Sequence, residues 1–139
     1  MPTTYAIPNG NQYFDISLWT GNTATQNIAN SGSMQPDLVW IKCRNQAGYG
    51  SELFDSVRGA TNYLISNSTG AEGTAANALT SFNSNGFTVG SYGFINASGD
   101  SEVAWQWQAG QGTTSSNTNG SITSTVSVNA TAGFSVATF

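Results

Sequence analysis

Residues that could carry out acid–base or nucleophilic chemistry are few in this chain. The sequence of 139 residues has no histidine. Neither a Ser-His-Asp nor a Cys-His site can therefore form, and the commonest metal ligand is missing. A glycosidase needs two carboxylates across a cleft. Five carboxylates are available, but nothing in their spacing pairs them: Glu52, Asp55, Glu72, Asp100 and Glu102. We expect solvated carboxylates in turns, and we predict no catalytic residue and no enzymatic activity.

Two further residue types could bind or react with a ligand. Asp100, with Asn96 and Ser98, could offer oxygen ligands to Ca²⁺, which takes several of them. We favour a turn-forming role for these three residues, and we predict no metal and no cofactor. The single cysteine, Cys43, cannot form an internal disulfide, and we expect it to be buried as a small apolar group.

Asp55 and Arg58 stand three residues apart in a segment that reads as a turn. A planar guanidinium suits bidentate bonds to a carboxylate. The structural interpretation is an ion pair that fixes the loop, with Asp55 capping the turn and Asp37 as a second possible partner of Arg58. The functional interpretation places Arg58 in a glycan site. We favour the structural interpretation.

The elements that must position these side chains are strands. Residues 37–44 and 102–108 alternate in size and polarity with a period of two, which is typical of strands. In residues 37–44, Val39, Ile41 and Cys43 share one face, and apolar groups on both faces indicate a central strand covered on two sides. In residues 102–108, Trp105 lies on the apolar face, and we expect it in the core with one face of Trp40.

Further short strands are expected between turn signals. They span residues 14–19, 25–29, 52–56, 62–66, 79–82, 87–89, 122–128 and 134–139, with a hairpin turn at 83–86, a tolerated helical turn at 71–77 and a linker-like tract at 110–120. Ser, Thr, Asn and Gly together make up 66 residues, yet 16 residues are aromatic. Strands at about ten-residue spacing predict an all-β fold, an antiparallel β-sandwich of jelly-roll type.

The domain organisation expected is an irregular arm at residues 1–12 followed by a sandwich domain at 13–139. The last expected strand runs to the final residue, Phe139, so we expect an N-terminal piece of a longer chain or a strand that pairs with a neighbour. An unpaired terminal strand is an association edge. Phe134, Val136 and Phe139 are the candidate residues of that edge.

Several ordered blocks of the chain resemble a module of tailed bacteriophages. The blocks are 35–42 (QPDLVWIK), 53–60 (LFDSVRGA), 63–64 with 66–69, 79–82 (LTSF), 86–90 (GFTVG), 96 with 98–99, 103–105 (VAW), 117–122 (NTNGSI) and 131–136 (TAGFSV). The module is common in marine phage genomes, in tail fibres and other virion structural proteins. The resemblance covers about residues 13–139 and implies a β-sandwich similar to concanavalin A or laminin G. Such modules often carry Asn where this chain has Cys43.

The expected function is therefore structural. The net charge of −4, with three basic residues, argues against nucleic acid and anionic membranes as partners. The resemblance implies a virion protein made in the host bacterial cytoplasm, with other tail or capsid proteins as partners. A tail-fibre or appendage domain acting in host attachment is the first interpretation, with a homo-oligomer, a trimer among the options. The alternatives are a capsid decoration protein and a free carbohydrate-binding module.

Contact with a host surface glycan would require exposed aromatic side chains. Trp19, beside a turn at residues 20–22, is the tryptophan that we expect to be most exposed. The aromatic loop at residues 92–95 offers Tyr92 and Phe94 as further contact residues. These three side chains are the candidate surface contacts.

Overall fold

The structure of the chain is a computed structural model that describes residue 7 and residues 9–139. Its elements are η1 (Gly10–Gln12), β1 (Phe14–Thr20), β2 (Gln26–Ala29), β3 (Leu38–Cys43), β4 (Ser51–Asp55), β5 (Asn62–Ile65), β6 (Gly73–Thr74), β7 (Leu79–Asn83), β8 (Gly86–Val89), α1 (Gly93–Asn96), β9 (Ser101–Trp107), β10 (Ser115–Asn117), β11 (Ser124–Asn129) and β12 (Phe134–Thr138). The predicted all-β class is confirmed. The predicted arm, residues 1–12, lies largely outside the described residues, and its described end contains η1.

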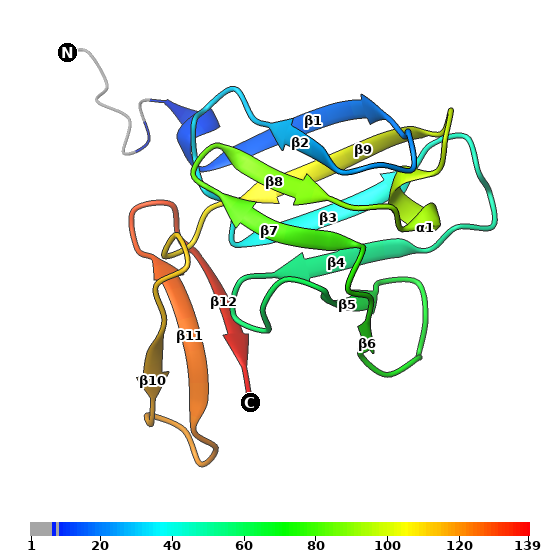
Figure 1. The fold of residues 1–139 in the computed structure, drawn as a ribbon. Coiled ribbons are helices and arrows are strands. Elements are labelled where there is room, and N and C mark those ends of the chain that lie inside the picture. The colour runs from blue at the N-terminus through cyan, green and yellow to red at the C-terminus, as the bar shows by residue number, and fades with distance from the viewer. Residues whose placement is uncertain (1–6, 8) are drawn as a thin grey trace.

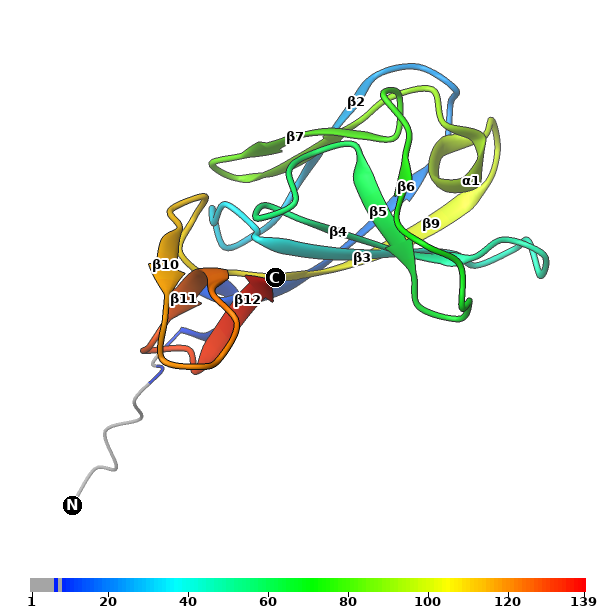
Figure 2. The ribbon, with the colours of Figure 1, turned by 90° about the horizontal axis from the view of Figure 1, so that it is seen from below.

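The strands form three antiparallel sheets (Figure 1). The largest has six strands in the order β1-β9-β3-β4-β5-β6, and the smaller sheets have the orders β2-β8-β7 and β10-β11-β12. The sheet β2-β8-β7 lies over one face of the six-stranded sheet, while β10-β11-β12 lies to one end of the sandwich (Figure 2). The predicted antiparallel β-sandwich is therefore confirmed.

The core lies between the six-stranded sheet and β2-β8-β7. Its buried members are Val39, Ile41, Phe54 and Ala104 from the first sheet, Ile28, Leu79, Phe87 and Val89 from the second, and Ala78 and Ile95 from the connections. Strand β3 alternates as predicted, because Val39, Ile41 and Cys43 are buried. The expectation that β3 is covered on both faces is wrong, since Trp40 is 36% exposed.

Strand β9 turns its polar side to the interior, opposite to the prediction. Glu102, Ala104 and Gln106 are fully buried, whereas Trp105 stays partly exposed on the other face. Gln106 is tolerated inside because its amide is hydrogen-bonded. Its Nε2 donates to Ser17 Oγ at 2.8 Å, and its Oε1 accepts from Asn30 Nδ2 at 3.3 Å. The placement of Trp105 in the core is therefore wrong.

Most predicted strands are found within one or two residues. The hairpin β7–β8 turns at residues 84–85, and Gly86 has a φ of +140°. A Cβ at Gly86 would lie 2.0 Å from Ile28 O, so only glycine fits there. The helical turn tolerated at residues 71–77 is not present, because this segment contains β6, and the helix is α1 instead. The linker-like tract at 110–120 contains β10.

Candidate assembly surface and buried carboxylate cluster

The outer face of the six-stranded sheet, away from the core, is apolar and open. The register places Ile16, Trp105, Trp40 and Leu53 side by side across β1, β9, β3 and β4. The exposed large apolar side chains of this outer face are Phe14 (37%), Ile16 (49%), Leu18 (63%) and Trp40 (36%). Scattered apolar residues are normal on a surface, but a continuous group of them marks a contact site.

The third sheet packs against one end of this outer face. Phe134, at the start of β12, stacks on Trp107 with ring centroids 6.2 Å apart and an interplanar angle of 22°. Trp107 in turn packs against Phe14 at 5.1 Å. At its other end, β12 borders a groove that Phe139 lines together with Leu64 and Arg58. Aromatic packing therefore holds the third sheet to the sandwich and leaves the rest of the outer face open.

Strand β12 is an edge strand, as the sequence indicates. Within the described residues it pairs only with β11. Of the three predicted edge residues, Phe139 is 96% exposed, Val136 is buried and Phe134 is half-buried. The backbone of β12 and Phe139 are thus available to a neighbour, whereas Phe134 and Val136 pack inward. The role of this edge in assembly stays a prediction.

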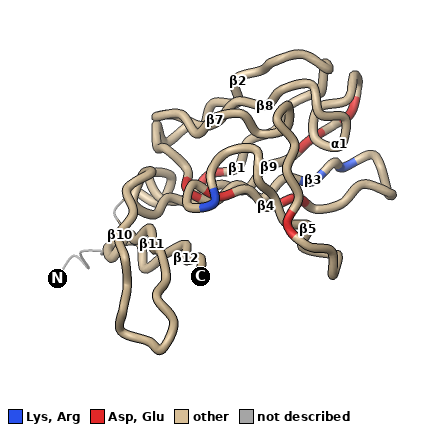
Figure 3. The backbone as a smooth tube through the Cα atoms, turned by 60° about the horizontal axis from the view of Figure 1, so that its bottom comes forward, with Lys and Arg blue, Asp and Glu red and all other residues tan. Residues whose placement is uncertain are grey.

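The third sheet carries no charged side chain. The sequence contains no Asp, Glu, Lys or Arg after Glu102. The strands β10, β11 and β12 accordingly carry none, and the few charged residues all lie in the sandwich (Figure 3). Covering the third sheet therefore desolvates no ion of its own, although Arg58 and Glu72 lie beside Phe139.

The three candidate glycan contacts differ in exposure. Trp19 is half-buried and packs edge-on against Phe87, with centroids 5.8 Å apart, so its expected exposure is wrong. It belongs to the core face of β1. Tyr92 also packs against the core, and its hydroxyl lies 3.1 Å from the hydroxyl of Tyr63. Phe94 is 45% exposed and packs edge-on against Tyr49 at 5.0 Å, so it is the one of the three that offers a free ring.

The predicted ion pair between Asp55 and Arg58 is present. Arg58 Nε donates to Asp55 Oδ2 at 2.5 Å, and Asp55 Oδ1 accepts from the backbone N–H groups of Val57 and Arg58. Asp55 is fully buried and caps the turn, as predicted. Arg58 makes its second, longer contact with Glu72, at 3.7 Å.

Asp37 is not a partner of Arg58, so that expectation is wrong. Its carboxylate accepts from the backbone N–H groups of Ala109, Gln111 and Gly112, each at 2.7 Å, and from Ser56 Oγ at 2.6 Å. The geometry of the β9–β10 connection draws Asp37 away from the arginine. Asp37 fixes the segment that leads into the third sheet.

Most carboxylates of the chain are buried rather than solvated. Five of the seven Asp and Glu residues are buried: Asp37, Glu52, Asp55, Asp100 and Glu102. The expectation of solvated turn carboxylates is therefore wrong for Glu52, Asp55, Asp100 and Glu102, and it holds for Glu72, whose side chain is 47% exposed. Asp37 and Asp55 are fully hydrogen-bonded. Buried oxygens without a partner remain on the other three.

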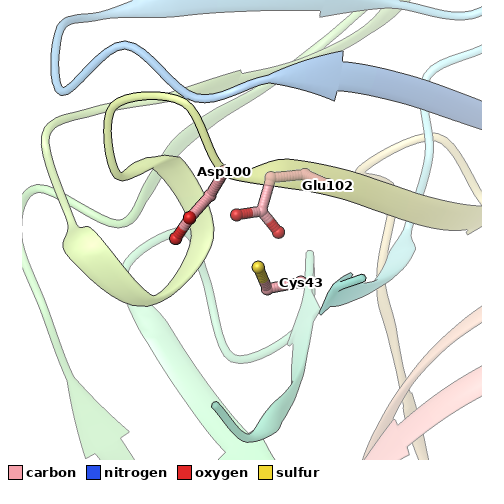
Figure 4. A group of neighbouring side chains, drawn as sticks. All are labelled: Cys43, Asp100 and Glu102. Atoms are coloured by element: carbon pink, nitrogen blue, oxygen red, sulfur yellow. The ribbon is translucent and has the colours of Figure 1, made fainter. Parts of the chain in front are cut away.

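Two of these carboxylates form a cluster with the thiol of Cys43 (Figure 4). Cys43 on β3 lies directly opposite Glu102 on β9, and Asp100 precedes β9. The ligand atoms of the three side chains all lie within 4.8 Å of one another. Cys43 is 1%, Asp100 5% and Glu102 0% exposed, so the predicted burial of Cys43 is confirmed. We call these three residues the carboxylate–thiol cluster.

The polar partners around the cluster are few. The single thiol hydrogen of Cys43 points to Asn45 Oδ1 at 3.2 Å, and that oxygen also accepts from Ser101 N at 2.9 Å. Gln46 Nε2 donates to Asp100 Oδ1 at 2.9 Å. Asp100 Oδ2 and both carboxylate oxygens of Glu102 have no hydrogen-bond partner. Such unpartnered buried oxygens are uncommon in folded proteins, and each requires an explanation.

Burial changes the acidity of these groups. Desolvation raises the pKa of Glu102 to about 7, and the nearby charge of Asp100 also raises it, while the neighbouring Cys43 thiol, Lys42 and Arg44 act in the opposite direction. Desolvation, with the charge of Glu102, raises the pKa of Glu52 to about 7. Burial raises the pKa of the Cys43 thiol. Near neutral pH each of the two glutamates is therefore partly protonated.

The hypothetical calcium set of Asp100, Asn96 and Ser98 does not assemble. The side chain of Asn96 is buried and is bonded to Gly90 O and Ala24 O through Nδ2, and to Gln26 Nε2 through Oδ1. Ser98 is exposed. Asn96 thus fixes the loops at the end of the sandwich, consistent with the structural role that we favoured.

Comparison with protein families gives one match. The family model described as a domain of unknown function, DUF7483, matches residues 9–139. The chain belongs to this family. No curated protein and no solved structure matches the chain. No helix of the described residues is long and apolar enough to span a membrane.

The sequence pattern did not predict the open apolar face or the carboxylate–thiol cluster. The alternation of β1 was visible, but its apolar residues Ile16 and Leu18 face outward. The carboxylate–thiol cluster depends on the pairing of β3 with β9, two strands that are about 60 residues apart in sequence. The usable signal was that Cys43 and Glu102 each stand at one end of a strongly alternating strand. Their mutual register could not be derived from that signal.

Proposed function

We propose that this domain is a non-enzymatic structural protein of a bacteriophage particle, a tail-fibre or appendage domain that assembles through its outer face and acts in host attachment. The observation that carries the assembly is the open apolar group on β1 and β3: Ile16, Leu18 and Trp40. Fully burying a side chain of this size is worth about 1.5–3 kcal/mol. A neighbouring subunit that covers this group gains the part of that free energy that corresponds to the area still exposed.

The edge of β12 supplies a second element of the same interface. It offers unpaired backbone groups next to the apolar outer face, and the third sheet contributes no ion that would have to be desolvated. A neighbour that extends this edge would gain backbone hydrogen bonds and cover Phe139 at once. The expected product is a homo-oligomer, with a trimer among the options, or a contact with another tail or capsid protein.

The place on the particle follows from the resemblance to phage modules and not from the geometry. The same apolar face suits a capsid decoration protein that joins neighbouring capsomers. The third alternative, a free carbohydrate-binding module, is supported by one feature, the exposed ring of Phe94 beside Tyr49. Because Trp19 and Tyr92 pack inward, this surface is small, and we rank carbohydrate binding last.

Immunogold labelling of intact virions tests the proposal, with antibody raised against this chain and virions of a phage whose genome encodes it. We expect label on the tail or its fibres. Label over the head would contradict the tail-fibre interpretation and support a capsid decoration protein. Particles without label, with the protein recovered free in the lysate, would remove the virion proposal.

A further inference from the structure

The carboxylate–thiol cluster has an arrangement that hydrogen bonding within the protein does not explain. Two carboxylates and a thiol meet in the interior, and three of the four carboxylate oxygens have no partner. Asp37 and Asp55 show how this chain stabilises a structural carboxylate, with three or four donors each. In the cluster, one carboxylate oxygen, Asp100 Oδ1, accepts a hydrogen bond from Gln46, and the other three accept none.

Protonation alone satisfies these groups only in part. A proton on Glu102 removes its charge and adds an O–H donor, which can pair with the unpartnered oxygen of Asp100 but leaves the other Glu102 oxygen without a partner. Burying a polar group without a hydrogen bond costs roughly 1–3 kcal/mol, and a buried charge without a partner costs more. A bound cation would satisfy the unpartnered oxygens and the charges together.

We propose that Cys43, Asp100 and Glu102 bind one divalent cation of the zinc class. Asp100 Oδ2 and one oxygen of Glu102 supply two ligands, and the sulfur of Cys43 supplies the third. On binding, the Cys43 S–H bond breaks, the sulfur donates its electron pair to the metal, and the proton leaves to solvent. The carboxylates bind as anions.

The donor set selects the metal. Zn²⁺ takes cysteine sulfur at about 2.3 Å and carboxylate oxygen at about 2.0–2.2 Å, usually with four ligands. Ca²⁺ and Mg²⁺ prefer oxygen ligands alone, so the sulfur of Cys43 disfavours them. The ligand atoms lie within 4.8 Å of one another, and tetrahedral zinc ligands lie roughly 3.3–3.8 Å apart. A contraction of about 1 Å, within reach of side-chain rotation, would complete the site.

A fourth ligand is available beside the cluster. Asn45 Oδ1 lies 3.2 Å from Cys43 Sγ, so it or a water molecule can fill the fourth position. The exposed residue Gln46 covers Asp100 through one hydrogen bond. Rotation of that side chain would open a path from solvent.

The test is metal binding by the full chain after removal of metals with a chelator. Isothermal titration with ZnCl₂ should give one site per chain, and Zn²⁺ should raise the melting temperature. Co²⁺ should give a thiolate-to-metal charge-transfer band in the near ultraviolet. The variants Cys43→Ser and Glu102→Gln should bind Zn²⁺ at least tenfold more weakly, and Cys43→Ser should lose the Co²⁺ band.

Two controls keep the result interpretable. Glu72→Gln removes an exposed carboxylate outside the cluster and should bind Zn²⁺ like the wild type. Circular dichroism identifies any variant that fails to fold. If both cluster variants fail to fold, the presence or absence of the Co²⁺ band in the wild type tests the proposal. Absence of that band, equal Zn²⁺ affinity in wild type and folded Cys43→Ser, or displacement of Zn²⁺ by equimolar Ca²⁺ would each overturn the proposal.

Discussion

Trp40 and Trp105 face each other across the β3–β9 pair, with ring centroids 5.3 Å apart and an interplanar angle of 45°, on the sheet face away from the core. The opposite side of the same two strands holds Cys43 and Glu102. These two strands therefore place tryptophan rings outside and the carboxylate of Glu102 inside. This inversion underlies both proposals, because it opens an apolar surface and buries unpartnered acids.

Leu18→Lys should weaken self-association without unfolding the domain. Leu18 is 63% exposed, so a charge there costs little in the isolated chain, but it would be buried without a partner in an interface. Sedimentation velocity should show a shift towards the monomer. Asn85→Lys adds the same charge at the exposed β7–β8 turn and should leave the distribution unchanged. Equal sedimentation of both variants and the wild type would exclude this face as the interface.

Arg58→Ala should lower the stability by about 2 kcal/mol, because it leaves the buried carboxylate of Asp55 without its cation. For a domain of this size that corresponds to a fall of roughly 6 °C in melting temperature. Glu72→Gln is the matched control, since Glu72 lies 3.7 Å from the guanidinium and is half-exposed. An unchanged melting temperature in Arg58→Ala would show that the pair is not structural.

Asp37→Ala should destabilise the domain by about 3 kcal/mol or more, because three backbone N–H groups and one hydroxyl lose their acceptor. Urea denaturation measures the loss. Hydrogen exchange should show faster exchange at Ala109, Gln111 and Gly112. Protection of these amides as strong as in the wild type would contradict the role assigned to Asp37.

Stability should fall as the pH rises from about 4.5 to about 7. The pKa of Glu52 is about 7 in the folded state against 4.5 in the unfolded chain, so the folded state binds more protons in that range. Glu102 acts in the same direction. The effect of Glu52 is on the order of 3 kcal/mol. This stabilisation is fully present below pH 4.5 and is lost as the pH rises to about 7. Above that pH, Glu52 no longer makes the stability depend on pH.

Glu52→Gln tests this dependence. The variant should have a flatter stability profile between pH 5 and pH 8, measured by urea denaturation with a chelator present. The pH dependence of stability that remains in this variant comes from Glu102. A profile as steep as that of the wild type would show that Glu52 carries its charge in the folded state near its ordinary pKa.

Local pattern fixed much of the secondary structure of this chain. The alternation in residues 37–44, the turn pair at Asn85 and Gly86 and the short turn after Asp55 all produced the predicted elements. These features depend on backbone preferences and on neighbours a few residues away. The all-β class and the Asp55–Arg58 pair could be predicted for the same reason.

The sequence by itself therefore determined the strands, the turns and the absence of histidine chemistry. The tertiary structure decided which face of each strand lies inside. Side chains alternate between the two faces of a strand, and the alternation alone does not say which face is buried. For β9 that choice depends on the neighbouring strands and on the covering sheet. Only that placement brought Cys43, Asp100 and Glu102 together, drew Asp37 away from Arg58, and left Ile16, Leu18 and Trp40 on the surface.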